Sequence, residues 1–374
     1  MNIAVDLRSL STGTISGVEN YTINLLENLL PLDKQNSYTL FYNGLAKSKF
    51  GDFHFVNSRV KNTRWPNKLL NLAFKSNLMK LENLAGDFDC LFMPNLNQFY
   101  VRSKAKVVLT VHDLSPVLAP EFYNVKRRLW HWFLNYKKAF SRADLLLAVS
   151  EYTKQDLIKC FNIDPNKIKV VYPGIDHKSF KPISDVAMLR SIRNQYSLPG
   201  DFILFLNTIE PRKNLINLIK AFDQLDSPCD LVIAGRKGWK YSEIFDAAKA
   251  SKKFAKIHYI GYIPEEQKPA IISLARVLVY PSFYEGFGFQ PIESMALGVP
   301  TVASNVTALP EITGDAALLV NPYDVLGIAK ALKVALEDEQ LRSRLKEKGL
   351  QRAKDFSWQK SAQGILDGFN KLNS

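Results

Sequence analysis

The sequence predicts an α/β protein of two domains, each with a parallel sheet covered by helices on both faces. Apolar segments rich in β-branched residues alternate with segments whose apolar residues recur at helical spacing. Continuous apolar strands that alternate with helices are typical of parallel sheets buried on both faces. The chain has 374 residues, and because a domain usually has about 100–200 residues, this length favours two domains.

Strands are expected in both halves of the chain. The first, residues 2–7, precedes a glycine-containing loop and a helix expected over residues 18–30, whose leucines lie on one face. The tail from residue 325 lacks strand signals and ends in a helix expected over residues 357–372. The other expected strands are 38–42, 90–93, 106–111, 145–149, 202–206, 231–234, 257–260, 277–280, 301–303 and 317–320.

The domain boundary is expected where two prolines and a glycine follow a strand that is expected directly before Tyr172. Pro173, Gly174 and Pro182 favour a linker, because these residues interrupt regular structure. The predicted parts are a first domain, a linker, a second domain and a C-terminal helix, with ranges 1–173, 174–182, 183–356 and 357–374.

The composition excludes several classes of protein. Hydrophobic residues make up 47% of the chain and charged residues 23%, unlike disordered, collagen-like or disulfide-rich chains. No apolar run approaches the ~18–20 residues that span a bilayer. The first residues lack the basic and apolar regions of a signal peptide, so we expect a cytoplasmic protein. Three scattered cysteines fit a reducing compartment and form no CxxC metal site.

The charge is unevenly distributed. The net charge is +13, of which residues 1–182 contribute +10 and residues 183–374 contribute +3. A basic surface attracts nucleic acid, anionic lipid or a phosphorylated substrate. Charge alone does not choose among these partners.

The strongest chemical signal is the segment YPSFYEGFGFQPIESMALGVP, residues 280–300. An expected strand ends at Tyr280, a glycine loop follows, and a helix is expected from about Pro291 to Gly298. The free N–H groups and the dipole at the start of a helix make an anion site. The segment therefore predicts an anion-binding loop.

Two carboxylates flank this predicted anion site, Glu285 in the loop and Glu293 in the helix. Eight residues correspond to about 12 Å along a helix, which suits two separate hydroxyl-bearing groups on either side of a phosphate. A nucleotide-sugar has this layout of sugar, diphosphate and ribose. Each glutamate alone is also explained as a local cap or a solvated helix residue, and only the combination is specific.

A second signal follows the expected strand 202–206. In the segment NTIEPRKN, residues 207–214, Arg212 and Lys213 are expected to open a helix, where the dipole disfavours cations. A bound anion would offset that cost. The alternative is an exposed pair of surface cations.

Three weaker signals lie in the first half. His112 follows a strand, and ligands of open α/β sheets bind beyond the carboxyl ends of strands, although a lone histidine is often structural. Gly17 opens the first expected helix, where a tight turn is an equal explanation. Asp87 and Asp89 resemble a metal-binding DxD pair, but they precede a strand away from the other signals. We assign them to surface structure and expect no metal site.

The Glu-x7-Glu spacing of Glu285 and Glu293, in the context described, resembles the motif of the family 4 retaining glycosyltransferases. The resemblance is dense over residues 202–324 and thinner over residues 10–30 and 107–182. It implies the GT-B fold, in which two Rossmann-like domains face each other across a cleft. The first domain would bind the acceptor and the second the activated sugar, and the C-terminal helix would cross back to the first.

The resemblance implies a role for each residue singled out above. Glu285 would hold hydroxyls of the transferred sugar, Glu293 would hold the ribose, and His112 would contact the transferred sugar. Arg212 and Lys213 would bind the diphosphate. The catalytic candidates are therefore His112 and Glu285, and the donor-binding candidates are Gly17, Arg212, Lys213, Gly286, Phe287, Gly288 and Glu293.

The resemblance also implies the chemistry of the leaving group. Many members carry a Gly-Arg pair where this chain has Asn207-Thr208, so Arg212 and Lys213 carry more of the positive charge. With no metal and no cofactor expected, these cations and the N–H groups of the glycine loop would stabilise the departing diphosphate. Retention of configuration is implied, and we favour attack on the face from which the diphosphate departs.

The donor is expected to be GDP-mannose, with UDP- or dTDP-sugars as alternatives. The segments 209–214, 235–239 and 302–305 resemble those of bacterial mannosyl- and rhamnosyltransferases of surface-polysaccharide assembly. Two other classes remain open, a nucleotide-sugar epimerase of the same fold and a basic nucleic-acid-binding protein. Nucleic acid is not the expected partner.

Two basic segments predict contact with an anionic membrane. Residues 59–80 and 122–143 each carry six Lys or Arg and no acidic residue, interleaved with Trp, Phe and Leu. The alternative is that Leu129, Phe133, Tyr136 and Phe140 face the core while the cations are solvated. We expect a peripheral protein at the inner face of the cytoplasmic membrane, with a glycan or lipid-linked acceptor.

Overall fold

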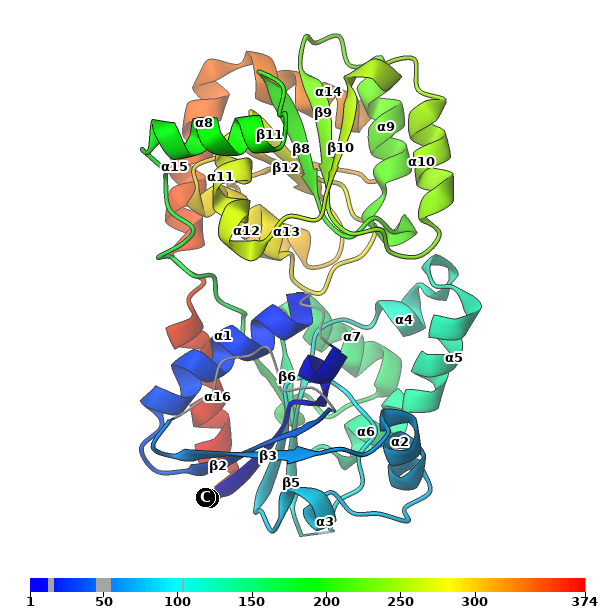
Figure 1. Ribbon diagram of the computed structural model, residues 1–374, viewed down its shortest axis with the longest axis vertical. Coiled ribbons are helices and arrows are strands. Elements are labelled where there is room, and N and C mark those ends of the chain that lie inside the picture. The colour runs from blue at the N-terminus through cyan, green and yellow to red at the C-terminus, as the bar shows by residue number, and fades with distance from the viewer. Residues whose placement is uncertain (13–16, 45–54, 103, 374) are drawn as a thin grey trace. The chain divides into compact units, whose positions relative to one another are not determined.

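The chain folds into two α/β units (Figure 1), and neither is continuous in sequence. The segment 115–128 belongs to the second unit by its contacts, whereas the predicted boundaries place it in the first domain. The C-terminal helix belongs to the first unit. The first unit comprises residues 1–114, 129–174 and 358–374, and the second comprises residues 115–128 and 175–357.

The structure is a computed structural model. Within the residues that it describes, no helix is both long enough and apolar enough to cross a membrane. The described residues are 1–12, 17–44, 55–102 and 104–373.

Seven parallel strands form the sheet of the first unit, in the order β3-β2-β1-β4-β5-β6-β7. The edge strand β3 was not predicted, because it is largely exposed and carries no long apolar run. A strand was expected directly before Tyr172, and the very short β7 lies there. The strands are β1 (Asn2–Asp6), β2 (Ser37–Asn43), β3 (Ser58–Thr63), β4 (Cys90–Met93), β5 (Lys106–Val111), β6 (Leu145–Ala148) and β7 (Ile168–Val170).

Side chains alternate along these strands between two helical layers. Leu91 and Met93 belong to a core shared with α2, α6 and α7, whereas Phe92 packs against Phe369 of α16 with ring centroids 5.5 Å apart. α1 packs beside α16 on this second face. The helices are α1 (Gly17–Leu32), α2 (Asn67–Lys75), α3 (Glu82–Ala85), α6 (Tyr136–Arg142), α7 (Glu151–Phe161) and α16 (Trp358–Asn373), with 3-10 turns at Arg8–Thr12 and Pro165–Lys167. α5 (Val125–Leu134) begins in the segment assigned to the second unit and ends in the first.

Six parallel strands form the sheet of the second unit, in the order β10-β9-β8-β11-β12-β13. All six fall within a residue or two of the predicted ranges, because each carries a short apolar run. They are β8 (Phe202–Leu206), β9 (Asp230–Ala234), β10 (Ile257–Gly261), β11 (Val277–Tyr280), β12 (Thr301–Ser304) and β13 (Leu318–Val320).

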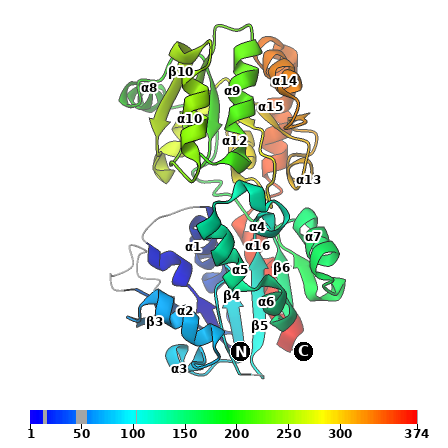
Figure 2. The same ribbon diagram turned by 90° about the vertical axis from the view of Figure 1, so that its right-hand side faces the viewer.

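Helices cover both faces of this sheet (Figure 2). One face packs on α9, α10 and α14, which share a core with Phe205 and Ile233, and the other packs on α12, beside α11 and α15. The helices are α4 (Ser115–Leu118), α8 (Val186–Gln195), α9 (Leu215–Gln224), α10 (Tyr241–Lys249), α11 (Lys268–Ser273), α12 (Phe289–Ala296), α13 (Leu309–Thr313), α14 (Val325–Glu337) and α15 (Glu339–Ala353), with 3-10 turns at Pro120–Phe122, Pro211–Lys213, Phe254–Lys256 and Glu265–Gln267.

The strand order positions the predicted motifs of the second unit. β8, β11 and β12 are neighbours and run parallel, so their carboxyl ends lie at one edge of the sheet. The loop after β8 carries Arg212 and Lys213, and the loop after β11 carries Glu285. Motifs separated by about seventy residues therefore meet at this edge.

Candidate active site

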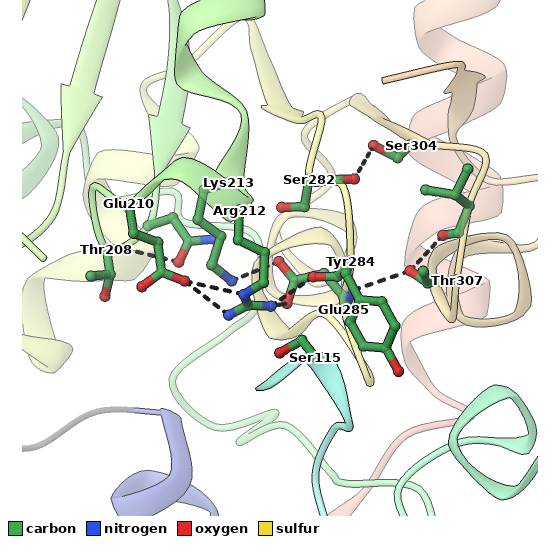
Figure 3. Close-up of polar contacts among 12 residues, drawn as sticks. Ser115, Thr208, Glu210, Arg212, Lys213, Ser282, Tyr284, Glu285, Ser304 and Thr307 are labelled. Carbon is green, nitrogen blue, oxygen red and sulfur yellow. Dashed lines mark hydrogen bonds and ion pairs between the residues drawn. The ribbon is translucent and has the colours of Figure 1, made fainter. Parts of the chain in front are cut away.

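Four buried charged side chains cluster where the loops after β8 and β11 meet (Figure 3). The Lys213 Nζ lies 2.6 Å from Oε1 of Glu285, and the Arg212 Nη1 lies 3.0 Å from Oε2 of the same carboxylate. The Arg212 Nε donates to Oε1 of Glu210 at 3.2 Å. Each of the four residues is at most 9% exposed, which excludes the alternative of an exposed cation pair.

The loop after β8 places the two cations by a short turn. Pro211–Lys213 form a single 3-10 turn that begins with proline, and Asn214 follows in the left-handed region with φ 62°. The Asn214 side-chain amide donates to the carbonyl oxygens of Pro281 and Pro322 at 2.9 and 2.7 Å. The prediction that the cations open the long helix is therefore corrected, since α9 begins only at Leu215.

Opposite charges control the ionisation of this cluster. Burial alone would raise the pKa of Glu285, but attraction to Lys213 and Arg212 outweighs burial and lowers the pKa to about 2. Burial and the neighbouring Arg212 lower the pKa of Lys213, whereas Glu285 and Glu210 oppose that effect. The cluster thus holds two cations against two carboxylates in a water-poor environment.

The glycine loop after β11 leads directly into α12. Gly288 has φ 111°, a conformation that favours glycine, and a Cβ at this position would lie 2.7 Å from Cδ2 of Leu309, so the Leu309 side chain would have to shift. α12 begins at Phe289, two residues earlier than predicted. Phe287 is buried and its ring packs against those of Phe289 and Phe356, so its side chain anchors the loop in the core.

Glu293 lies on α12 and has different partners from Glu285. It is 5% exposed, and its Oε1 lies 3.4 Å from Nζ of Lys268. Oε2 is buried and has no hydrogen-bond partner among the residues that the structure describes. Burial raises the pKa of Glu293, and the charge of Lys268 opposes this rise. Glu293 is therefore not a solvated helix residue. The two glutamates are buried separately, and each carboxylate has its own cationic partners.

His112 lies in the first unit, after β5. Its Nε2 lies 2.8 Å from the carbonyl oxygen of Pro94, and its ring packs edge-on against Tyr21 with centroids 4.7 Å apart. Burial lowers the pKa of His112, which favours the neutral imidazole at pH 7. When Nε2 of a neutral imidazole donates a hydrogen bond to a carbonyl oxygen, Nδ1 can accept a hydrogen bond from a polar partner.

Gly17 and the two predicted surface aspartates also lie in the first unit. Gly17 is the exposed first residue of α1, and a Cβ there would meet no atom within 4 Å, so nothing described requires glycine. The preceding residues 13–16 lie outside the described part. Asp87 pairs with Arg102 at 2.6 Å, and Asp89 accepts from the backbone N–H of Asn2 at 2.8 Å. The described residues hold no group of three or more His, Cys, Asp or Glu that could bind a metal.

Two residues of the site were missed by the sequence reasoning. Glu210 lies in the segment NTIEPRKN, two residues before Arg212. This short spacing could have indicated that the two side chains form an ion pair. Lys268 lies 25 residues from Glu293, and no local pattern connects them. Only the packing of α11 beside α12 brings Lys268 to the carboxylate.

Both halves of the chain match models of glycosyltransferases. Residues 15–179 match the family described as Glycosyltransferase Family 4, and residues 191–352 match that described as Glycosyl transferases group 1. The O-antigen chain mannosyltransferase B of Escherichia coli is 32% identical over 271 residues, which cover 71% of this chain and 71% of the relative. The serotype-specific mannosyltransferase WbdA of Escherichia coli is 30% identical over 273 residues, and the chain spans only about a third of that longer relative.

Solved structures share the fold at lower identity. The Anabaena protein Alr3699/HepE, in complex with UDP and glucose, superimposes with a TM-score of 0.76 at 18% identity, covering 99% of this chain and all of that one. WaaG, a glycosyltransferase involved in lipopolysaccharide biosynthesis, gives a TM-score of 0.73 at 14% identity, covering 98% of each chain. Together with two parallel-sheet units and the family matches over both halves, these likenesses identify the chain as a glycosyltransferase of family 4 with the GT-B fold.

Proposed function

We propose that this glycosyltransferase transfers mannose from GDP-mannose to a glycan or lipid-linked acceptor in polysaccharide assembly, with retention of configuration. Two relatives described as mannosyltransferases, one of them of the O-antigen chain, support the sugar and the pathway class. UDP- and dTDP-sugars are the alternative donors. The relatives named here are transferases, which favours sugar transfer over the epimerase alternative.

The observation that carries the proposal is the buried cluster of Glu210, Arg212, Lys213 and Glu285. A diphosphate that enters the cluster brings negative charge to two cations held by hydrogen bonds at 2.6–3.2 Å. Glu285 then shares its cations with the phosphate, and its carboxylate can accept hydrogen bonds from sugar hydroxyls. We assign the backbone of Gly286, Phe287 and Gly288 to the diphosphate and Glu293 to the ribose.

The proposed reaction breaks the bond from the sugar anomeric carbon to the phosphate oxygen and forms a bond to the acceptor oxygen on the same face. The acceptor hydroxyl gives its proton to the departing phosphate oxygen, so charge and atoms balance. Arg212 and Lys213 stabilise the diphosphate as its negative charge grows. Neutral His112 is assigned to a hydrogen bond with the transferred sugar, and Gly17 to the donor side of the first unit.

The proposal is tested first by ligand-dependent stability. A ligand at about 100 times its Kd adds about 2.7 kcal/mol to the stability of a protein that binds it only when folded. We expect GDP-mannose to raise the Tm more than UDP-glucose or dTDP-rhamnose. A rise with UDP- or dTDP-sugars alone would overturn the donor assignment, and no rise with any of them would overturn the function. Conversion of the nucleotide-sugar without acceptor would favour the epimerase.

The product identifies the stereochemistry. The α-configured donor should give an α-linked mannoside, which NMR distinguishes by the coupling constant at the anomeric carbon. A β-linked initial product would overturn retention.

We also propose that the enzyme binds anionic lipid through α2, α6 and the part of α5 from Leu129 onward, which all lie in the first unit. Lys75 of α2 lies 3.8 Å from the ring of Phe133 and 5.1 Å from that of Trp132, so the two basic segments are neighbours. Trp132 is 77% exposed and Leu129 61%, whereas Phe140 is buried. The alternative, in which these apolar residues all face the core, is thus partly wrong, because Leu129 faces solvent.

Vesicle sedimentation tests the lipid proposal. Each surface cation near an anionic leaflet contributes about 1 kcal/mol. Binding at low salt and release at high salt are expected, and K68E/K137E/K138E should abolish binding. Arg127 is left unchanged because its guanidinium packs on Trp239 at 4.1 Å. The control K220E/K252E/K330E carries the same charge change on exposed residues of the second unit. Wild-type enzyme that stays in solution with anionic vesicles, or equal losses in both triple variants, would refute the proposal.

A further inference from the structure

Lys268 lies next to the ribose-binding candidate and has no role in the function proposed above. It is the first residue of α11, and its side chain is 13% exposed. Its Nζ lies 2.7 Å from Oε1 of Glu265 and 3.4 Å from Oε1 of Glu293. A cation in the first turn of a helix is disfavoured by the helix dipole, so its position is explained by the two carboxylates.

The two oxygens of Glu293 are not equivalent. Oε1 faces Lys268, and Oε2 is buried without a hydrogen-bond partner among the residues described. A buried polar atom without a partner costs free energy, and a ligand hydroxyl would satisfy it. Lys268 therefore engages one oxygen and leaves the other for a ligand.

We propose that Lys268 is a positioning residue of the nucleotide site, which holds Oε1 of Glu293 so that Oε2 is presented to the ribose hydroxyls. The inference rests on the proposed function, because it takes Glu293 as the ribose acceptor. Lys268 itself is not assigned a contact with phosphate or base.

The charges around Glu293 predict a pH signature. Burial raises the pKa of Glu293, Lys268 opposes this rise and Glu265 adds to it. Within the described part of the chain, Lys268 and Glu265 are the charged groups that act most strongly on Glu293, and the elements packed against α12 are α11, α13, α15, β11 and β12. Without Lys268 the carboxylate takes up a proton at a higher pH, and a protonated carboxyl accepts fewer hydrogen bonds from a diol.

Calorimetric titration with GDP, and with UDP in parallel, tests the inference, because both carry ribose and diphosphate. K268M should bind about tenfold more weakly at pH 7, since hydrogen bonds to a charged group contribute free energy of that order. The ratio of the K268M Kd to the wild-type Kd should grow as the pH falls from 8 to 5.5. Protonation of the terminal phosphate of the nucleotide, which has a pKa of about 6, affects both proteins and cancels in this ratio. K268R, which keeps the charge, should stay within about threefold of wild type.

A double-mutant cycle separates positioning from direct contact. If Lys268 acts through Glu293, K268M should change the Kd less than twofold in an E293Q background. Equal losses in both backgrounds would mean direct contact with the nucleotide and would overturn the inference, as would a K268M protein with the wild-type Kd at every pH. The control K348M removes an exposed ion pair to Asp315 and should leave the Kd unchanged.

Failure of the inference and failure of the proposed function give different results. E293Q that binds both nucleotides as wild type does, or wild type that binds neither, would overturn the proposed site and the inference with it. E293Q with weakened binding beside an unaffected K268M would overturn the inference alone. If K268M fails to fold, the Kd of K268Q is compared with that of wild type instead. Thermal unfolding of each variant verifies that it is folded.

Discussion

Replacing Lys213 with methionine should destabilise the second unit in a pH-dependent way. The substitution keeps the buried aliphatic volume and removes the ammonium that lies 2.6 Å from Oε1 of Glu285. Removal of one partner of a buried ion pair costs about 3–5 kcal/mol. Arg212 still holds Oε2 at 3.0 Å, so we expect about 3 kcal/mol at pH 7.

The sign of the pH dependence follows from the pKa of Glu285. Its value of about 2, against an ordinary value of 4.5, corresponds to about 3 kcal/mol of stability. This stability is present above pH 4.5 and is lost as the pH falls toward 2. Because Lys213 is the leading cation in this depression, the stability difference between wild type and K213M should narrow as the pH falls from 7 to 3.

Urea unfolding at several pH values measures this difference. K348M is the matched control, because it removes an exposed ion pair and should show neither the loss nor the narrowing. A K213M protein as stable as wild type at pH 7, or a difference independent of pH, would refute the electrostatic reasoning. In the same variant, sugar transfer should fall by about 10²–10³, as is typical when one stabilising donor is removed from a developing charge.

Three further predictions concern the two glutamates, Gly288 and the absence of a metal requirement. E293A should raise the donor KM and E285A should mainly lower kcat, as steady-state kinetics would show; wild-type kinetics in both would remove the two glutamates from the mechanism. Gly288→Ala should cost about 1–3 kcal/mol, because φ is 111° and Cδ2 of Leu309 lies 2.7 Å from the added Cβ; unchanged unfolding would contradict this. Sugar transfer should continue in the presence of a metal chelator such as EDTA. Strict dependence on Mn²⁺ or Mg²⁺ would contradict the metal-free mechanism and make Asp87 and Asp89 candidate metal ligands.

Local patterns predicted most of the fold. The six strands of the second sheet were found because most of them are apolar runs bounded by polar residues, and β10, Ile257–Gly261, still carries two isoleucines and a tyrosine. β3 was not predicted because its residues Ser58–Thr63 are mostly polar and exposed. Such a strand has no apolar pattern in the sequence. The start of α12 was predicted near Pro291, two residues too late. The helix begins at Phe289, and Pro291 is its third residue.

The candidate site was predicted in composition but not in arrangement. The sequence by itself determined that Glu285, Arg212 and Lys213 occur in segments after strands and that Glu293 lies in the helix that follows, and parallel strands bring such segments to one edge of a sheet. Only the tertiary structure decided that both cations bind one carboxylate, that Glu210 balances the second charge, and that Lys268 reaches Glu293. The physical reason is that these charges are buried: each must find a partner within about 4 Å, and that partner is chosen by packing in three dimensions rather than by spacing along the chain.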